Sequence, residues 1–224
     1  MKKSLRENGL GLFFALIFLL ALFGQAVTGH ALYNEDQLTA GFSTVSFGEY
    51  VTSASFGVDV AENWQSEYLQ FLLYIAATIW LVQKGSPESK DLNNAGTGTD
   101  KEQLTGAFAT SKSPAWATVT GWRQWLFSNS LVLVMGTIFF LSWFAQSVAG
   151  VSAYNEQQIQ ELQAPLSWVE YVLSPEFWNR TLQNWQSEFL AVGSMVVLSI
   201  YLRQRGSPES KPVGAAHDAT GTTG

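Results

Sequence analysis

Apolar runs alternate with polar stretches along the chain, and two of these runs contain no charged residue over 18 positions. They are residues 10–27 and 131–148. Eighteen helical residues rise about 27 Å, close to the ~30 Å hydrocarbon core of a bilayer. Each is followed by a shorter uncharged run, at 68–83 and 189–202. This pattern predicts an all-α membrane protein with four transmembrane helices.

The second half of the chain repeats the first. A shift of 121 residues aligns 5–90 with 126–211 without a gap, and 36 of the 86 aligned positions are identical. The longest identical blocks are Asn-Trp-Gln-Ser-Glu, at 63–67 and 184–188, and Gly-Ser-Pro-Glu-Ser-Lys, at 85–90 and 206–211. The four helices therefore come from a tandem duplication of a two-helix unit.

The first repeat is expected to span residues 1–90, with helices at about 10–27 and 64–84. An outer loop, 28–63, connects these two helices. Residues 91–121 follow, and they are rich in Gly, Thr, Ser, Asn and Ala. Such a composition buries too little apolar surface to order a chain, so we expect a flexible cytoplasmic linker there.

The second repeat is expected to span residues 122–211, with helices at about 131–148 and 175–204. Its outer loop is 149–174. A short stretch at its start places Trp and Arg residues at helical spacing, which is typical of an interfacial segment that leads into a membrane. The remaining residues, 212–224, are expected to be a disordered tail.

Both outer loops carry signals for short helices. The Ser-x-x-Glu patterns at 46–49 and 167–170 are capping boxes, in which a hydroxyl and a carboxylate satisfy the free amides of a helix start. Ser174-Pro175 is a further start signal, because proline is favoured at the first helical position. The Asn-x-x-Gln patterns at 34–37 and 155–158 predict one more short helix in each loop. We therefore expect a helical outer layer.

The basic residues fix the expected orientation. Eleven of the twelve Lys and Arg residues precede the first helix, separate the second from the third, or follow the fourth. The segments between these groups of bases and outside the apolar runs, 28–67 and 149–188, hold eleven acids and one base, Arg180. The positive-inside rule then places both termini in the cytoplasm. A cleavable signal peptide is the alternative for the first run, but the same run recurs in mid-chain.

Composition excludes several kinds of chemistry. The chain has no Cys and two His, so it cannot form disulfides, thiolate metal sites or a His-rich metal site. It carries no nucleotide-binding loop, zinc-protease motif or nucleophile elbow, and no basic groove for nucleic acid. We therefore expect no enzyme activity, no metal and no cofactor.

The two Asn-Trp-Gln-Ser-Glu blocks, called the pentads below, are the strongest candidate site. Five consecutive residues face all sides of a helix, so one packing stripe does not explain them. Glu67 and Glu188 could approach one another and share a proton or hold a cation. Alternatively, the Trp rings anchor at the interface while the polar residues crosslink the outer helices. The candidates are Asn63, Trp64, Gln65, Ser66, Glu67, Asn184, Trp185, Gln186, Ser187 and Glu188.

Gln25 and Gln146 are a second candidate pair. Each lies two residues before the outer end of a long apolar run. An amide at that depth either hydrogen-bonds between helices or lines a polar cavity.

The paired blocks, each pair with one helix between them, resemble a family of uncharacterised bacterial multi-pass membrane proteins classed as a domain of unknown function. The resemblance covers both repeats and leaves out the linker and the tail. It implies the bacterial cytoplasmic (inner) membrane and brings no activity, cofactor or catalytic residue.

The sequence favours a structural or accessory envelope protein. Its expected partners are the lipid bilayer and either another membrane protein or further copies of this chain. An oligomeric channel or carrier for a cation or small solute is the main alternative, because four helices alone enclose little space. A membrane enzyme that uses Glu67 and Glu188 as acid and base is the third class.

Overall fold

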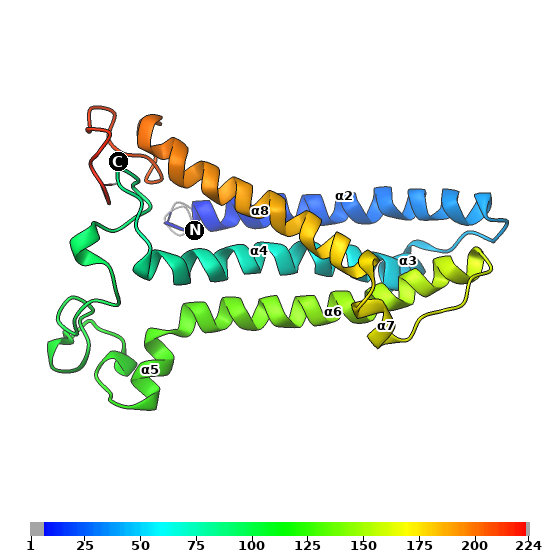
Figure 1. Ribbon diagram of the computed structural model, residues 1–224, viewed down its shortest axis with the longest axis horizontal. Coiled ribbons are helices and arrows are strands. Elements are labelled where there is room, and N and C mark those ends of the chain that lie inside the picture. The colour runs from blue at the N-terminus through cyan, green and yellow to red at the C-terminus, as the bar shows by residue number, and fades with distance from the viewer. Residues whose placement is uncertain (1–6, 223–224) are drawn as a thin grey trace. The chain divides into compact units, whose positions relative to one another are not determined.

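The computed structural model describes residues 7–222, and all regular structure in that range is helical. The all-α prediction is therefore confirmed for these residues. Two helices have 31 residues, α2 (Gly9–Thr39) and α6 (Ser130–Gln160). Two have 27 residues, α4 (Ala54–Trp80) and α8 (Pro175–Tyr201). Figure 1 colours the helices in chain order.

Shorter helices lie between the long ones. Two have five residues and follow the capping boxes, as predicted: α3 (Phe47–Val51) and α7 (Trp168–Val172). Helix α5 (Trp122–Ser128) precedes α6. Three single turns of 3₁₀ helix, η1 (Leu92–Asn94), η2 (Gly106–Phe108) and η3 (Ala115–Ala117), lie in the segment between the repeats.

The chain divides into two compact units that do not coincide with the two sequence repeats. The first unit contains residues up to 61 together with 145–177, and the second contains 62–144 together with 178 onwards. Each unit therefore combines segments from both repeats. The connecting segments are the helices α4, α6 and α8, which pass from one unit into the other.

Only α2 and α6, among the described residues, are long and apolar enough to cross a membrane, with mean hydropathies of 2.4 and 1.9 over 18 residues. The expectation of four such helices is thus supported for two. Helices α4 and α8 end at 80 and 201, before the expected 84 and 204. Their uncharged helical parts, 68–80 and 189–201, have 13 residues each.

The outer ends of α2 and α6 differ from the expectation. Both helices continue twelve residues beyond the predicted ends at 27 and 148, so no separate short helix forms around Asn34 or Asn155. The Asn34 side chain instead holds the following loop: Val45 N–H donates to Oδ1 (2.7 Å), and Nδ2 donates to the Val45 carbonyl (3.0 Å). Asn155 binds both backbone groups of Leu166 in the same way. Because each amide is used by the loop, neither caps a new helix.

Helix α8 begins at Pro175, as predicted, and the Ser174 hydroxyl accepts the Phe177 N–H (3.4 Å). Helix α4 begins at Ala54, ten residues before the expected 64, and Ser53 accepts the Phe56 N–H (3.2 Å). The first repeat therefore uses the same serine start as the second. It lacks the proline that marks the start in the sequence.

A buried tyrosine holds each short helix of the first unit against a glycine. Tyr171, on α7, is fully buried, and a side chain on Gly150 would overlap its hydroxyl group. Its ring centroid lies 5.6 Å from those of Tyr154 and Phe177. The first repeat places Tyr50 against Gly29, Tyr33 and Phe56 in the same manner. Glycine is required at both positions because the ring occupies the place of a Cβ.

The linker and the tail, expected to be flexible and disordered, both make defined contacts in the second unit. Gly96 N–H donates to the Ile79 carbonyl (2.6 Å), and Gly221 N–H donates to the Ser86 carbonyl (3.1 Å). The last carbonyls of a helix have no partner within it. The carbonyl of Ile79, near the end of α4, accepts a hydrogen bond from the linker. Backbone hydrogen bonds of this kind hold the linker in place, although it has few apolar side chains.

Candidate functional site

The pentads lie on α4 and α8, in the second unit, and their members are exposed to different extents in the two helices. On α4, Gln65 and Ser66 are buried, whereas Asn63, Trp64 and Glu67 are exposed. On α8, Asn184, Trp185 and Glu188 are half-buried, whereas Gln186 and Ser187 are exposed. The same five residue types therefore have different surroundings in the two repeats.

One hydrogen bond joins the two pentads. The indole Nε1 of Trp185 donates to Oε1 of Gln65 at 2.7 Å. The Trp185 ring lies among aromatic neighbours, 5.8 Å from Trp143 and 6.4 Å from Phe139 between centroids. The Nε2 of Gln65 is buried and has no hydrogen-bond partner in the part of the chain that the structure describes. A buried donor without a partner is costly, so a polar group that reached it would be stabilised.

An ion pair lies about one helical turn before Gln65 and Trp185. Arg180 Nε donates to Glu62 Oε2 at 2.7 Å, with side chains 31% and 17% exposed. Asn184 donates to Glu62 Oε1 (3.4 Å) and to the Arg180 carbonyl (3.1 Å). Sequence reasoning missed this pair. The available signal was that Arg180 is the only base in the segments 28–67 and 149–188.

The structure brings the two pentad carboxylates close enough to interact. Burial raises the pKa of Glu188, and the negative charge of Glu67 raises it further. Both residues precede the uncharged runs of their helices. Glu188 therefore binds a proton more readily than an isolated carboxyl group. Whether these two acids share a proton or hold a cation, or serve only to crosslink helices, stays a prediction.

Gln25 and Gln146 both lie in the first unit, on α2 and α6. Gln25 is half-buried and Gln146 is fully buried. Next to Gln146, the hydroxyl of Ser147 accepts a hydrogen bond from the Trp168 indole at 3.0 Å. Whether the two amides connect helices or line a polar cavity stays a prediction.

The Gly-Ser-Pro-Glu-Ser-Lys blocks form two loops of the same construction, which we call the first hook (83–90) and the second hook (204–211). In the first, the Ser89 hydroxyl accepts the Gln83 N–H (2.8 Å), and in the second Ser210 accepts that of Gln204 (2.9 Å). Gly85 turns the chain with a φ of +86°. Because the hydroxyl takes an amide that would otherwise extend the helix, α4 and α8 end before the hooks.

The lysines that end the two hooks differ in their surroundings. Lys211 is 1% exposed, and the three N–H donors of its ammonium group are shared among four carbonyls. These belong to Gly85 (2.6 Å), His217 (2.8 Å), Ala216 (3.1 Å) and Ala219 (3.2 Å). The equivalent Lys90 is exposed and donates to the Gly96 carbonyl (2.7 Å). The sequence of the two blocks is identical and does not distinguish the lysines, so this site was missed.

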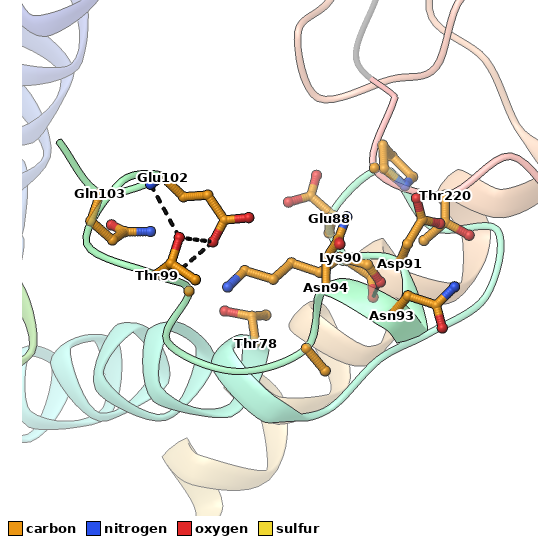
Figure 2. A pocket seen from close by; sticks show the side chains of 15 residues that line it. Thr78, Glu88, Lys90, Asp91, Asn93, Asn94, Thr99, Glu102, Gln103 and Thr220 are labelled. Atoms are coloured by element: carbon orange, nitrogen blue, oxygen red, sulfur yellow. Dashed lines mark hydrogen bonds between the residues drawn. The ribbon is translucent and has the colours of Figure 1, made fainter. Parts of the chain in front are cut away.

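A cavity of about 920 Å³ lies beside the first hook. Figure 2 shows the Lys90 side chain reaching toward Thr99 and Glu102, and both the amide and the hydroxyl of Thr99 donate to the Glu102 carboxylate. Glu88 also lines the cavity and accepts the Tyr74 hydroxyl at 2.7 Å. Across residues 7–222, no three His, Asp or Glu side chains gather in a way that could hold a metal ion.

Comparison with known families matches residues 1–222 to a family described as a domain of unknown function (DUF6766). No curated protein matches the chain, and no solved structure matches it.

Proposed function

Because the chain belongs to this family of unknown function, we propose a role from its own structure. It is a multi-pass protein of the bacterial cytoplasmic membrane that acts by binding other membrane components and not by catalysis. Its partners are the lipid bilayer and either another membrane protein or further copies of this chain.

The exposed apolar surface of α2 carries this proposal. In the most apolar 18 residues of α2, 6% are buried. Leu10, Leu20 and Phe23 expose 75%, 62% and 64% of their surface. Soluble monomers rarely expose a continuous apolar patch larger than a few hundred Å². Lipid tails or partner helices are the surroundings in which such a helix is stable.

The charge distribution supports four crossings. Helices α2 and α6 are long enough to cross, and the bases that follow α4 and α8 return the chain to the side on which it began. We propose that α4 and α8 make the return crossings, so that both termini and both hooks are cytoplasmic.

Cysteine labelling tests this topology cleanly because the chain has no Cys of its own. Single cysteines at Thr39 and Gln160 should react with a membrane-impermeant thiol reagent in intact cells. Cysteines at Lys112 and Thr222 should react only after the cells are opened. Release of the protein from membranes by alkaline carbonate would contradict the membrane assignment. Labelling of Lys112→Cys in intact cells would contradict the orientation alone.

A channel or carrier for a cation or small solute is the second candidate. It is favoured by the buried Gln65 amide and by the interacting carboxyl groups of Glu67 and Glu188. Proteoliposome flux distinguishes the candidates. A carrier shows cation or solute flux that falls on Gln65→Leu, whereas a binding protein shows none and retains partners in mild detergent.

A further inference from the structure

A groove runs along one face of α8 and ends at the second hook. Its volume is about 430 Å³, within the range of small-molecule sites. Ala191, Met195, Leu198 and Leu202 line it. These residues recur at intervals of three and four, so they form one apolar stripe about 16 Å long.

The hook end of the groove is charged. Glu209 lines it and is exposed. Its carboxylate makes no hydrogen bond or ion pair within the described part of the chain, but it lies close enough to Tyr74 for its charge to act on that hydroxyl. Arg203 lines the same end, and its positive charge lies close enough to Lys211 to add to the lowering of that lysine's pKa by burial. An apolar stripe thus leads to one negative group, Glu209, and one positive group, Arg203. The guanidinium of Arg203 also donates to the carbonyls of Ser199, Ile200, Leu202 and Ala215.

The first repeat shows what such a carboxylate takes as a partner. Glu88 is the equivalent of Glu209, and Tyr74 is the equivalent of Met195. In the first repeat the Tyr74 hydroxyl donates to Glu88 at 2.7 Å. Met195 has no donor. The second repeat therefore keeps the acceptor and lacks the internal donor.

We propose that this groove binds a phospholipid with a primary ammonium headgroup, whose acyl chain lies along α8 and whose ammonium donates to Glu209. The phosphate then faces the positive charge of Arg203. This inference rests on the proposed membrane location.

The groove favours a lipid over a partner helix because its charged residues lie only at the end nearest the second hook. A single apolar stripe ends in one acceptor and one positive group, which matches one acyl chain and the zwitterionic headgroup of a phospholipid. The stripe is also open: Leu198 and Leu202 expose 51% and 61% of their surface, on a segment that the proposed topology places in the cytoplasmic leaflet.

Competition between two lipids tests the proposal. The full-length protein is reconstituted in vesicles that contain equal amounts of phosphatidylethanolamine and phosphatidylcholine with identical acyl chains. It is then re-extracted in mild detergent, and retained lipid is counted by native mass spectrometry. Phosphatidylcholine has the same phosphate and no N–H donor. We expect about tenfold more phosphatidylethanolamine retained, the ratio that one charge-assisted hydrogen bond provides.

Two substitutions in the groove and one control complete the test. Glu209→Gln should abolish the preference, and because Glu209 is exposed the fold is retained. Met195→Tyr, which supplies the donor found in the first repeat, should reduce retention of both lipids. Glu88→Gln is the matched control in the first repeat and should leave the preference unchanged.

Equal retention of the two lipids by the unaltered protein would overturn the proposal, as would an unchanged preference in Glu209→Gln. Neither result affects the membrane assignment, which carbonate extraction tests separately. Release of the protein from membranes by alkaline carbonate would remove the proposed function and this inference together.

Discussion

Replacing Lys211 with Met should detach the tail from the second unit. The three N–H donors of the ammonium group are shared among four carbonyl acceptors at 2.6–3.2 Å, and Met removes these hydrogen bonds while keeping most of the volume. A hydrogen bond to a charged group contributes about 1.5–3 kcal/mol. Against this, Met avoids the cost of burying a charge, which amounts to several kcal/mol. Three hydrogen bonds from a charged donor outweigh that cost, and we expect a net loss of about 2–3 kcal/mol.

Hydrogen exchange measures this loss locally. The amides of Gly85 and Gly221 are held by Thr220 and Ser86, and both bonds depend on the docked tail. A loss of 2–3 kcal/mol should speed their exchange about 30- to 150-fold. The control is Lys90→Met, which removes one bond from an exposed lysine and should change exchange less than about fivefold. Equal effects of the two substitutions would refute the reasoning, because the four-carbonyl site would then add nothing.

Three further predictions concern stability. Gly150→Ala should cost about 1–3 kcal/mol by pushing Tyr171 from its place, whereas Gly193→Ala, where a Cβ meets nothing within 4 Å, should not lower the melting temperature; equal melting temperatures would contradict the close-approach argument. Hydrogen bonds within the capping boxes lower the pKa of Glu49 and Glu170 below 4.5, so their stabilisation is present above pH 4.5 and is lost as pH falls through the lowered values. The Glu49→Gln/Glu170→Gln variant should therefore melt below wild type at neutral pH and converge with it in acid, and a constant difference would count against this. Because the pKa of Glu188 is raised, wild type should gain on Glu67→Gln/Glu188→Gln as pH falls from neutral toward 4.5, and a wild-type advantage at neutral pH that fades in acid would reverse this assignment.

Features that depend on neighbours in sequence could be predicted. The capping boxes of α3 and α7 and the proline start of α8 are local, because the hydroxyl, the carboxylate and the amides that they join lie within four residues. The apolar runs of α2 and α6 predicted helices for the same reason. The continuation of α2 and α6 beyond residues 27 and 148 could not be predicted. Asn34 could cap a new helix or bind the following loop, and the sequence does not distinguish these two roles.

Features that join distant segments could not be predicted. The two pentads are identical in sequence, yet Gln65 is buried and Gln186, its counterpart on α8, is exposed. The bond from Trp185 to Gln65 links residues 120 apart, and no local pattern encodes it. Lys211 and Lys90 likewise end identical Gly-Ser-Pro-Glu-Ser-Lys blocks, and their different surroundings arise from the segments that follow.

The short uncharged parts of α4 and α8 have a consequence for the membrane itself. Thirteen helical residues rise about 20 Å, roughly 10 Å less than an average hydrocarbon core. In the proposed topology the bilayer thins around these two helices, at a cost of fractions of a kcal/mol per Å. The mismatch favours thinner bilayers, and it draws the headgroup region toward Glu67 and Glu188. Lipid chain length alone should then change the stability of this protein, with no ligand and no mutation.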